Sequence, residues 1–228
     1  MHPWRICPAG QYYRRGGTVR PHTRNGLPVK GGARTATCAH NPTGKDQLYP
    51  EEMHEISEKY FGQFKATPLK TLSEYKRRGN RYDYLIQGWV QYWNEVLNPK
   101  KPIEPDLIKA LVASESGFNP KAWNGLRGSA RACGLLQVTD KSLRFLSDHF
   151  HELDDHFLNL TEDDMLDPNL AISAGVRWIF RKKQLAESKA KKAITWRDAV
   201  AAFKGVAPTD DLMKKFDRYY AELKGDAK

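Results

Sequence analysis

The strongest constraint on the fold is a run of apolar side chains at helical spacing in residues 80–98. The run begins at Tyr82 and continues at intervals of three and four residues through Leu85, Ile86, Trp89, Val90, Trp93, Val96 and Leu97. Such spacing places all of these side chains on one face of an α-helix, which Pro99 and Pro102 would end. Because the tryptophans share this face with Leu and Val, we expect them in the protein core rather than on a ligand-binding surface.

Other segments with the same periodicity predict a mostly helical protein from residue 50 onward. Tyr49-Pro50 marks a boundary, since a residue before proline is disfavoured in a helix, and the following Glu51 and Glu52 suit a helix start. Further helices are predicted near residues 105–115, 140–150, 168–190, 195–204 and 210–224. Hydrophobic residues make up 40% of the 228-residue chain and charged residues 28%, which is typical of a globular protein.

Residues 1–49 have a different character, rich in Gly, Pro, Arg and Thr and without helical periodicity. Turn signals at Gly16-Gly17, Asn25-Gly26 and Gly31-Gly32 indicate a small module that is β-rich or irregular. The first 50 residues carry eight basic side chains and one acidic one, which is +7 of the net charge of +10. Such a basic module favours an anionic partner: nucleic acid, anionic lipid or a bacterial wall polymer. The sequence thus predicts a basic module (1–49), a helical segment (50–99) that packs on the rest, and a main domain (100–228).

The three cysteines leave several alternatives open for the basic module. Cys7 and Cys38 bracket it, and with His22 and His40 they could form a structural zinc site, although a tight C-x-x-C spacing is lacking. A Cys7–Cys38 disulfide and two unbridged cysteines are the other two readings. Cys133 lies outside the module and is expected to be buried. No metal site and no other cofactor is expected in the main domain.

Residues 105–120 contain the most informative carboxylate. Leu107, Ile108, Leu111 and Val112 form the apolar face of a short helix, and Glu115 continues that face just before Gly117 and Pro120 end the helix. Apolar surroundings and the negative end of the helix dipole both favour a protonated carboxyl group. A carboxylic acid of this kind can protonate a leaving oxygen near neutral pH. The alternative is that the helix ends and Glu115 turns into solvent.

Four short motifs resemble those of the soluble lytic transglycosylase (SLT) domain, glycoside hydrolase family 23. Residues 115–120 (E-S-G-F-N-P) resemble its E-S-x-F-x-P signature, and residues 134–138 (G-L-L-Q-V) resemble G-L-M-Q-[LIV]. Residues 167–175 (D-P-N-L-A-I-S-A-G) resemble D-P-x-x-N-I-x-x-G, and residues 201–205 (A-A-F-K-G) stand where the family usually has A-x-Y-N-x-G. Each motif is weak alone, but their order over residues 100–206 makes the resemblance specific.

The resemblance implies a lysozyme-like, mostly helical α+β domain with a cleft for a glycan. By the same resemblance, Glu115 is the catalytic acid and base, and Ser116, Gln137 and Phe203 bind substrate. The implied reaction cleaves the β-1,4 bond between N-acetylmuramic acid and N-acetylglucosamine in bacterial peptidoglycan and leaves 1,6-anhydromuramic ends, without cofactor. Phe203 replaces the family's tyrosine and Lys204 its asparagine, so we expect the surroundings of Glu115 to differ from those usual in the family.

Two other functions compete with this one: a hydrolytic muramidase, and a non-catalytic protein that binds wall or nucleic acid through residues 1–49. The intact motif around Glu115 favours an enzyme, and the basic module lacks a recognisable nucleic-acid-reading helix. The module is expected to dock on an anionic wall polymer or an export machine. No apolar run approaches the roughly 20 residues of a membrane span, and no apolar stretch typical of a secretory signal follows Met1. We therefore expect action in the bacterial cell envelope, reached without a classical signal or after lysis.

Overall fold

The computed structural model describes residues 4–8, 10–19, 22–24, 27–29, 32–41, 45–63, 68–125, 131–151, 153 and 155–225. It is mostly helical, as predicted, with helices α1 (Pro50–Tyr60), α2 (Lys76–Asn80), α3 (Asp83–Leu97), α4 (Pro105–Ser116), α5 (Asp140–Leu146), α6 (Pro168–Ala190), α7 (Trp196–Lys204) and α8 (Met213–Lys224). Short 3₁₀ turns occur at Phe61–Gln63, Ser73–Tyr75 and Asp163–Leu166. Helix α5 ends at Leu146, earlier than predicted, because the chain leaves the helix at Ser147 in a non-helical conformation.

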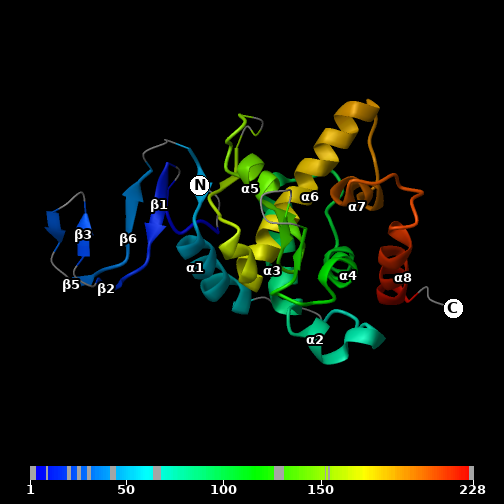
Figure 1. The fold of residues 1–228 in the computed structure, drawn as a ribbon, viewed down its shortest axis with the longest axis horizontal. Coiled ribbons are helices and arrows are strands. Elements are labelled where there is room, and N and C mark those ends of the chain that lie inside the picture. Colours follow the sequence, from blue (N-terminus) through cyan, green and yellow to red (C-terminus); the bar gives the residue numbers. More distant parts are fainter. Residues whose placement is uncertain are drawn as a thin grey trace.

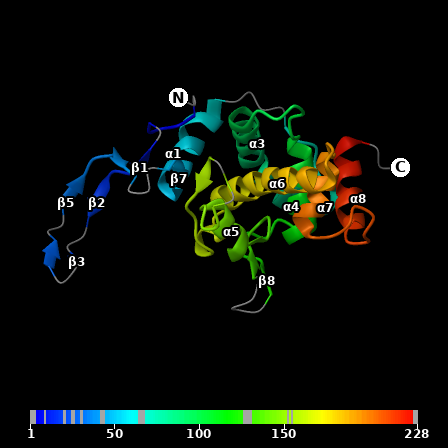
Figure 2. The same ribbon diagram turned by 90° about the horizontal axis from the view of Figure 1, so that it is seen from above.

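Helix α6 runs through the middle of the helical region, in contact with α1, α3, α5 and α7 (Figure 2). Trp89 and Trp93 of α3 are fully buried against it. The indole N–H of Trp89 donates to Asn169 Oδ1 (2.8 Å), and that of Trp93 donates to the Ser173 carbonyl oxygen (3.1 Å). The prediction that these tryptophans belong to the core is therefore confirmed.

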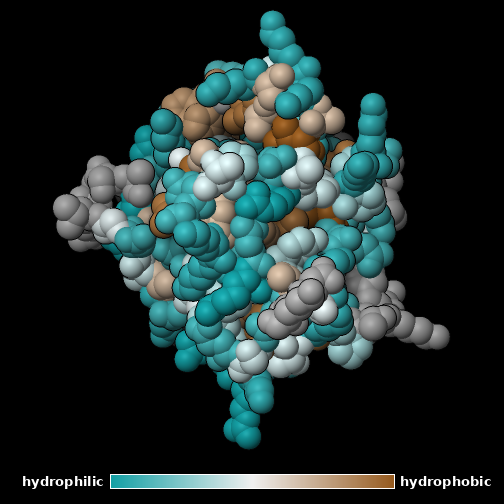
Figure 3. All heavy atoms as spheres, turned by 90° about the vertical axis from the view of Figure 1, so that its right-hand side faces the viewer, coloured by the Kyte–Doolittle hydropathy of each residue, from teal (hydrophilic) through white to brown (hydrophobic). Residues whose placement is uncertain are grey.

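Helix α8 packs against α4 and lies at the opposite end of the molecule from the N-terminal strands (Figure 1). Seen from that end, the surface is mainly hydrophilic (Figure 3). Beneath it, α4 carries Lys109, whose side chain is fully buried and pairs with Asp83 at 2.7 Å. Its ammonium also donates to the Lys70 carbonyl and to Asn80 Oδ1, both at 2.9 Å, so this buried charge is well satisfied.

The N-terminal strands form one two-stranded antiparallel ribbon that projects from the helices (Figures 1 and 2). Its pairs are β1 (Gln11–Arg14) with β6 (Thr37–His40), β2 (Gly17–Val19) with β5 (Gly32–Arg34), and β3 (His22–Arg24) with β4 (Leu27–Val29). The register does not slip between the pairs, which match Gln11 with His40, Gly17 with Arg34 and His22 with Val29. The chain thus does not reverse at Gly16-Gly17, as the turn signal suggested. Asn25-Gly26 lies outside the described residues.

The base of the ribbon is held by a Cys7–Cys38 disulfide. Of the three alternatives for these cysteines, the structure contains the disulfide, which leaves neither the Cys7 nor the Cys38 sulfur as a thiolate for the zinc site expected with His22 and His40. The side chain of His22 lies outside the described part of the chain.

The first residues of the chain pack into the helical region. The Trp4 ring is buried and makes edge contacts with Tyr60 (5.5 Å between centroids) and Tyr92 (6.4 Å). Arg5 Nε lies 2.8 Å from Glu52 Oε1, and the Glu52 side chain is fully buried. Residues 4–7 therefore share the core of α1 and α3, although the ribbon beyond them extends away from it.

Two small sheets complete the structure. β7 (Gln47–Leu48) pairs in parallel with β11 (Phe157–Leu158), and β9 (Ala132–Cys133) pairs with β8 (Trp123–Asn124) and β10 (Val138–Thr139). Cys133 is fully buried, as predicted. No helix in the described ranges has the length and hydropathy that a membrane span requires.

Candidate active site

Glu115 lies in the last turn of α4, at the end of the apolar face that the sequence predicted. Leu107, Ile108, Leu111 and Val112 are buried, and the Glu115 side chain is only 17% exposed. Gly117 ends the helix in the left-handed region (φ 57°), where its N–H donates to the Ala113 carbonyl oxygen at 3.2 Å. The carboxylate is thus held in a half-buried position and does not turn freely into solvent.

Lys204 is the partner of Glu115, and its ammonium forms an ion pair with Glu115 Oε1. Lys204 is the last residue of α7, which Gly205 ends in the left-handed region (φ 74°), and its side chain is 11% exposed. The C-terminal ends of α4 and α7 therefore meet at this pair. Negative helix ends disfavour a carboxylate, whereas an adjacent ammonium stabilises it, so Lys204 opposes the two effects expected from the sequence.

Gln137 stabilises the turn between β9 and β10. Its side-chain Nε2 donates to the Gly134 carbonyl oxygen (2.8 Å) and to the Ala122 carbonyl oxygen (3.2 Å). The described residues provide no hydrogen bond to its Oε1. The amide nitrogen is thus engaged with the main chain, and the carbonyl oxygen is the atom left to accept a bond from a ligand.

Close backbone packing explains two glycines in the motifs. A Cβ atom at Gly134 would lie 2.0 Å from the Met165 carbonyl oxygen, and one at Gly175 would lie 2.2 Å from Leu136 Cδ1. The turn that carries Gln137 therefore sits directly on the 3₁₀ turn Asp163–Leu166 and on α6, and any larger residue at either glycine would displace it.

Ser116 and Phe203 are the other two residues, besides Gln137, for which the sequence predicted a role in substrate binding. The Ser116 hydroxyl donates to the Val112 carbonyl oxygen within its own helix (3.3 Å), the alternative that any helix-terminal serine offers. Phe203 lines a cavity of about 370 Å³ together with Thr139, Lys141, Ser142, Phe145, Trp178, Lys182 and Leu185. The substrate-binding roles expected for Ser116, Gln137 and Phe203 stay predictions.

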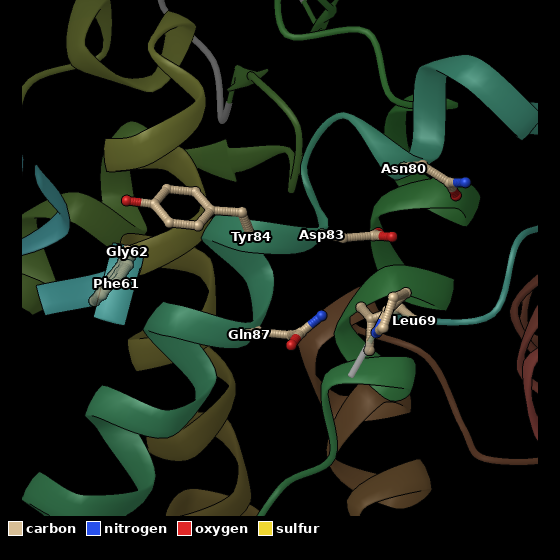
Figure 4. Close-up of a pocket in the computed structure, with 8 residues that line it drawn as sticks. Phe61, Gly62, Leu69, Asn80, Asp83, Tyr84 and Gln87 are labelled. Atoms are coloured by element: carbon tan, nitrogen blue, oxygen red, sulfur yellow. The ribbon is translucent and has the colours of Figure 1, made fainter. Parts of the chain in front are cut away.

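A second cavity of about 430 Å³ lies beside α3 and includes none of the predicted site residues (Figure 4). Its lining consists of Phe61, Gly62, Pro68, Leu69, Asn80, Asp83, Tyr84 and Gln87. Two of its polar groups are already engaged, since Asp83 and Asn80 both bind the buried Lys109. This cavity therefore does not extend the candidate site.

The aspartate of the third motif has a structural role. Asp167 caps α6 by accepting the backbone N–H groups of Asn169 (2.8 Å) and Leu170 (3.4 Å), and it pairs with His54 at 3.3 Å. The hydrogen bond with Asp167 raises the pKa of His54 above its usual value. Burial alone would raise the pKa of Asp167, but His54 and the backbone N–H groups outweigh it and lower that pKa. Across the described ranges, no three His, Cys, Asp or Glu side chains are placed to hold a metal ion.

The role of Lys204 is what sequence reasoning missed. The sequence showed that lysine replaces asparagine in the fourth motif and that the surroundings of Glu115 should differ, but it did not show an ion pair between two residues 89 positions apart. The asparagine-to-lysine change was the signal in the sequence, because the meeting of the two helix ends depends on tertiary packing.

Comparison with known proteins agrees with the four motifs. The family described as "Transglycosylase SLT domain" matches residues 91–208. Among solved structures, the chain is similar to the 70 kDa soluble lytic transglycosylase of Escherichia coli, with 18% identity, a TM-score of 0.34, and coverage of 77% of this chain and 33% of that chain. No curated protein matches. Since the family match spans more than half of its residues, the chain belongs to the SLT transglycosylase domain family.

Proposed function

We propose that this protein is a peptidoglycan lytic transglycosylase that cleaves the β-1,4 bond between N-acetylmuramic acid and N-acetylglucosamine. The observation that carries the proposal is the half-buried Glu115 at the meeting point of α4 and α7, inside the segment that matches the SLT family. A lone carboxyl group in this setting is suited to serve first as an acid and then as a base.

In the first step, Glu115 donates its proton to the glycosidic oxygen, and the bond from that oxygen to the muramic C1 breaks. The substrate N-acetyl group stabilises the positive centre that develops at C1, as the family resemblance implies. In the second step, the Glu115 carboxylate removes the proton of the muramic C6 hydroxyl, whose oxygen then bonds to C1 and closes the 1,6-anhydro ring. The reaction returns Glu115 to its protonated form and consumes no water.

Lys204 favours the second of these steps over the first. Its ammonium stabilises the carboxylate form of Glu115, which is the base. The first step requires Glu115 to take up a proton and loosen this ion pair before the glycan oxygen can receive that proton. Gln137 can accept a bond from a sugar N–H or O–H through its free carbonyl oxygen, and Ser116 can do so once its hydroxyl turns from Val112.

The remaining features are consistent with action in the bacterial envelope. A Cys7–Cys38 disulfide persists in oxidising compartments, and the periplasm and cell surface are among these. The projecting basic ribbon suits attraction to an anionic wall polymer or an export machine.

The decisive experiment compares Glu115→Gln with wild type on a peptidoglycan suspension. The amide keeps the size of the side chain but cannot donate a proton as an acid does, so we expect cleavage to fall by at least a hundredfold, the lower end of what general acid–base catalysis contributes. Glu58→Gln is the matched control, because this carboxylate is 55% exposed on α1 and pairs with Arg15.

Mass spectrometry of the soluble products decides between the two enzymatic alternatives. Fragments that weigh one water less than their hydrolysed counterparts carry anhydro ends and support the proposal. Reducing ends alone would assign the protein as a hydrolytic muramidase. A fully active Glu115→Gln variant would contradict the assignment of Glu115. Wild-type protein that releases no fragments from any peptidoglycan would contradict it as well, together with the proposed function.

A further inference from the structure

The chain makes a sharp turn directly after Glu115, in residues 116–119, here named the Gly117 turn. Gly117 and Phe118 both have left-handed backbone conformations, with φ of 57° and 61°. Glycine adopts such a conformation without a steric cost, whereas phenylalanine does not. The N–H of Asn119 donates to the Ser116 carbonyl oxygen at 3.1 Å and closes the turn. Two left-handed residues in succession therefore fix the direction in which the chain leaves α4.

Phe118 is held in this conformation by aromatic rings from the segment before α3. Its ring is fully buried, packs edge-on against Tyr75 (5.4 Å between centroids) and is stacked with Tyr82 (6.3 Å). A Cβ atom at Gly79 would lie 3.2 Å from the same ring, so α2 packs closely on it as well. A strained backbone persists only where its surroundings dictate it, and such residues gather at functional sites. The packing around this ring therefore fixes the backbone of the Gly117 turn.

Gly117 itself is contacted by two side chains of the same segment. Arg78 donates from one guanidinium nitrogen to the Gly117 carbonyl oxygen at 3.2 Å. A Cβ atom at Gly117 would lie 3.2 Å from the Tyr75 hydroxyl oxygen, so this hydroxyl lies against the turn. The Gly117 carbonyl follows the last residue of α4, at the negative end of the helix, where a cation is favourable. The side chains that hold the turn thus come from outside α4.

The support of the turn continues into α8. The Tyr219 hydroxyl lies 3.2 Å from the Tyr75 hydroxyl and donates to Glu74 Oε2 at 2.8 Å. Tyr75 and Arg78 precede the segment that matches the SLT family, and Tyr219 follows it. Parts of the chain on both sides of that segment therefore hold the turn that follows Glu115.

We infer that Arg78 is a positioning residue for Glu115 and acts through the Gly117 turn. The inference rests on the proposed function, because it concerns the placement of the acid and base of that reaction. Only one residue separates Glu115 from Gly117, so a shift of the turn moves the carboxylate relative to a bound glycan. A displacement of about 1 Å can lower a reaction rate by about a hundredfold, even when the substituted residue is far from the reacting atoms.

Arg78→Met tests the inference in the full chain, with Arg77→Met as the matched control. Both arginines are exposed on α2, and the described residues provide no hydrogen bond or ion pair to Arg77. On a soluble glycan strand, we expect kcat to fall by about tenfold in Arg78→Met, with KM and Tm unchanged. Arg77→Met should keep all three at their wild-type values. Arg78→Lys retains a cation that can donate to the carbonyl oxygen and should recover most of the lost kcat.

Amide hydrogen exchange followed by NMR gives a second readout, which does not depend on cleavage. The N–H groups of Gly117 and Asn119 bond the Ala113 and Ser116 carbonyl oxygens, so their exchange reports opening of the turn. We expect both to exchange about tenfold faster in Arg78→Met than in Arg77→Met.

Three results would overturn the inference and leave cleavage by Glu115 intact. The first is an unchanged kcat in Arg78→Met, and the second is unchanged exchange at both amides. The third is a rise in KM at constant kcat, because it would place Arg78 at the substrate rather than behind Glu115. If wild type cleaves no glycan strand, the proposed function fails, and the inference fails with it.

Discussion

Removal of the Arg5 side chain is the sharpest test of how the N-terminal residues join the helical region. Arg5 Nε bonds the fully buried Glu52, whose Oε1 also accepts the backbone N–H groups of Ile6 (3.2 Å) and Cys7 (3.4 Å). Breaking a buried ion pair from one side costs about 3–5 kcal/mol, because the remaining charge stays buried. The two backbone donors persist in Arg5→Met, so we expect a loss near the lower end, about 3 kcal/mol.

Thermal unfolding followed by circular dichroism measures this loss. For a chain of this length, 1 kcal/mol corresponds to about 2–4 °C, so the Tm of Arg5→Met should fall by about 6–12 °C. Arg15→Met is the matched control, because it removes an arginine–glutamate pair between the ribbon and α1, with Arg15 52% and Glu58 55% exposed. An exposed pair contributes at most about 1 kcal/mol. Equal and small shifts in both variants would refute the claim that residues 4–7 belong to the helical core.

Three further perturbations address the site and its supports. Lys204→Asn, which removes the ion pair that occupies Glu115, should raise kcat/KM for peptidoglycan cleavage, and an unchanged kcat/KM would deny Lys204 any influence on the acid. His54 has a raised pKa, so its pair with Asp167 stabilises the fold fully below the unfolded histidine value of about 6.5 and less as the pH rises through the folded pKa. His54→Gln should therefore reduce the loss of Tm between pH 5.5 and 8.5, which calorimetry at both pH values checks. Replacing residues 15–36 with a two-residue turn shortens the ribbon and should leave the Tm unchanged. Binding to intact wall should then depend less on salt concentration, because fewer basic side chains remain for salt to screen. Identical salt dependence in both forms would show that the ribbon does not attract the wall.

The sequence predicted the helices well because their apolar residues repeat at a spacing that only a helix can bury on one side. Burial on the other sides of a helix was not predictable in the same way. Lys109 points away from the apolar face of α4 and is nevertheless fully buried, because the segment of residues 70–83 covers it and supplies its three partners. That arrangement depends on how a distant segment crosses α4, which no local pattern contains.

In the candidate site, too, one part was predictable from the sequence and another part depends on how the helices pack. The position of Glu115 followed from the periodicity of one helix and from the family motif, whereas its pairing with Lys204 depends on where α7 ends relative to α4. Lys141 of α5 and Lys182 of α6 line one cavity with Phe203, and only the packing of these helices brings them there.

The unbroken register of the ribbon has a consequence for how its length can change in evolution. Both strands return to the same base at Cys7 and Cys38, so residues inserted at the far end do not alter where the chain enters α1. One residue added to each strand would extend the ribbon by about 3.4 Å and turn every later side chain to the opposite face. Two residues added to each strand would extend it by about 7 Å and keep the faces as they are. Relatives that differ in the distance over which they reach a partner should accordingly differ in ribbon length by multiples of four residues, with the helical region unchanged.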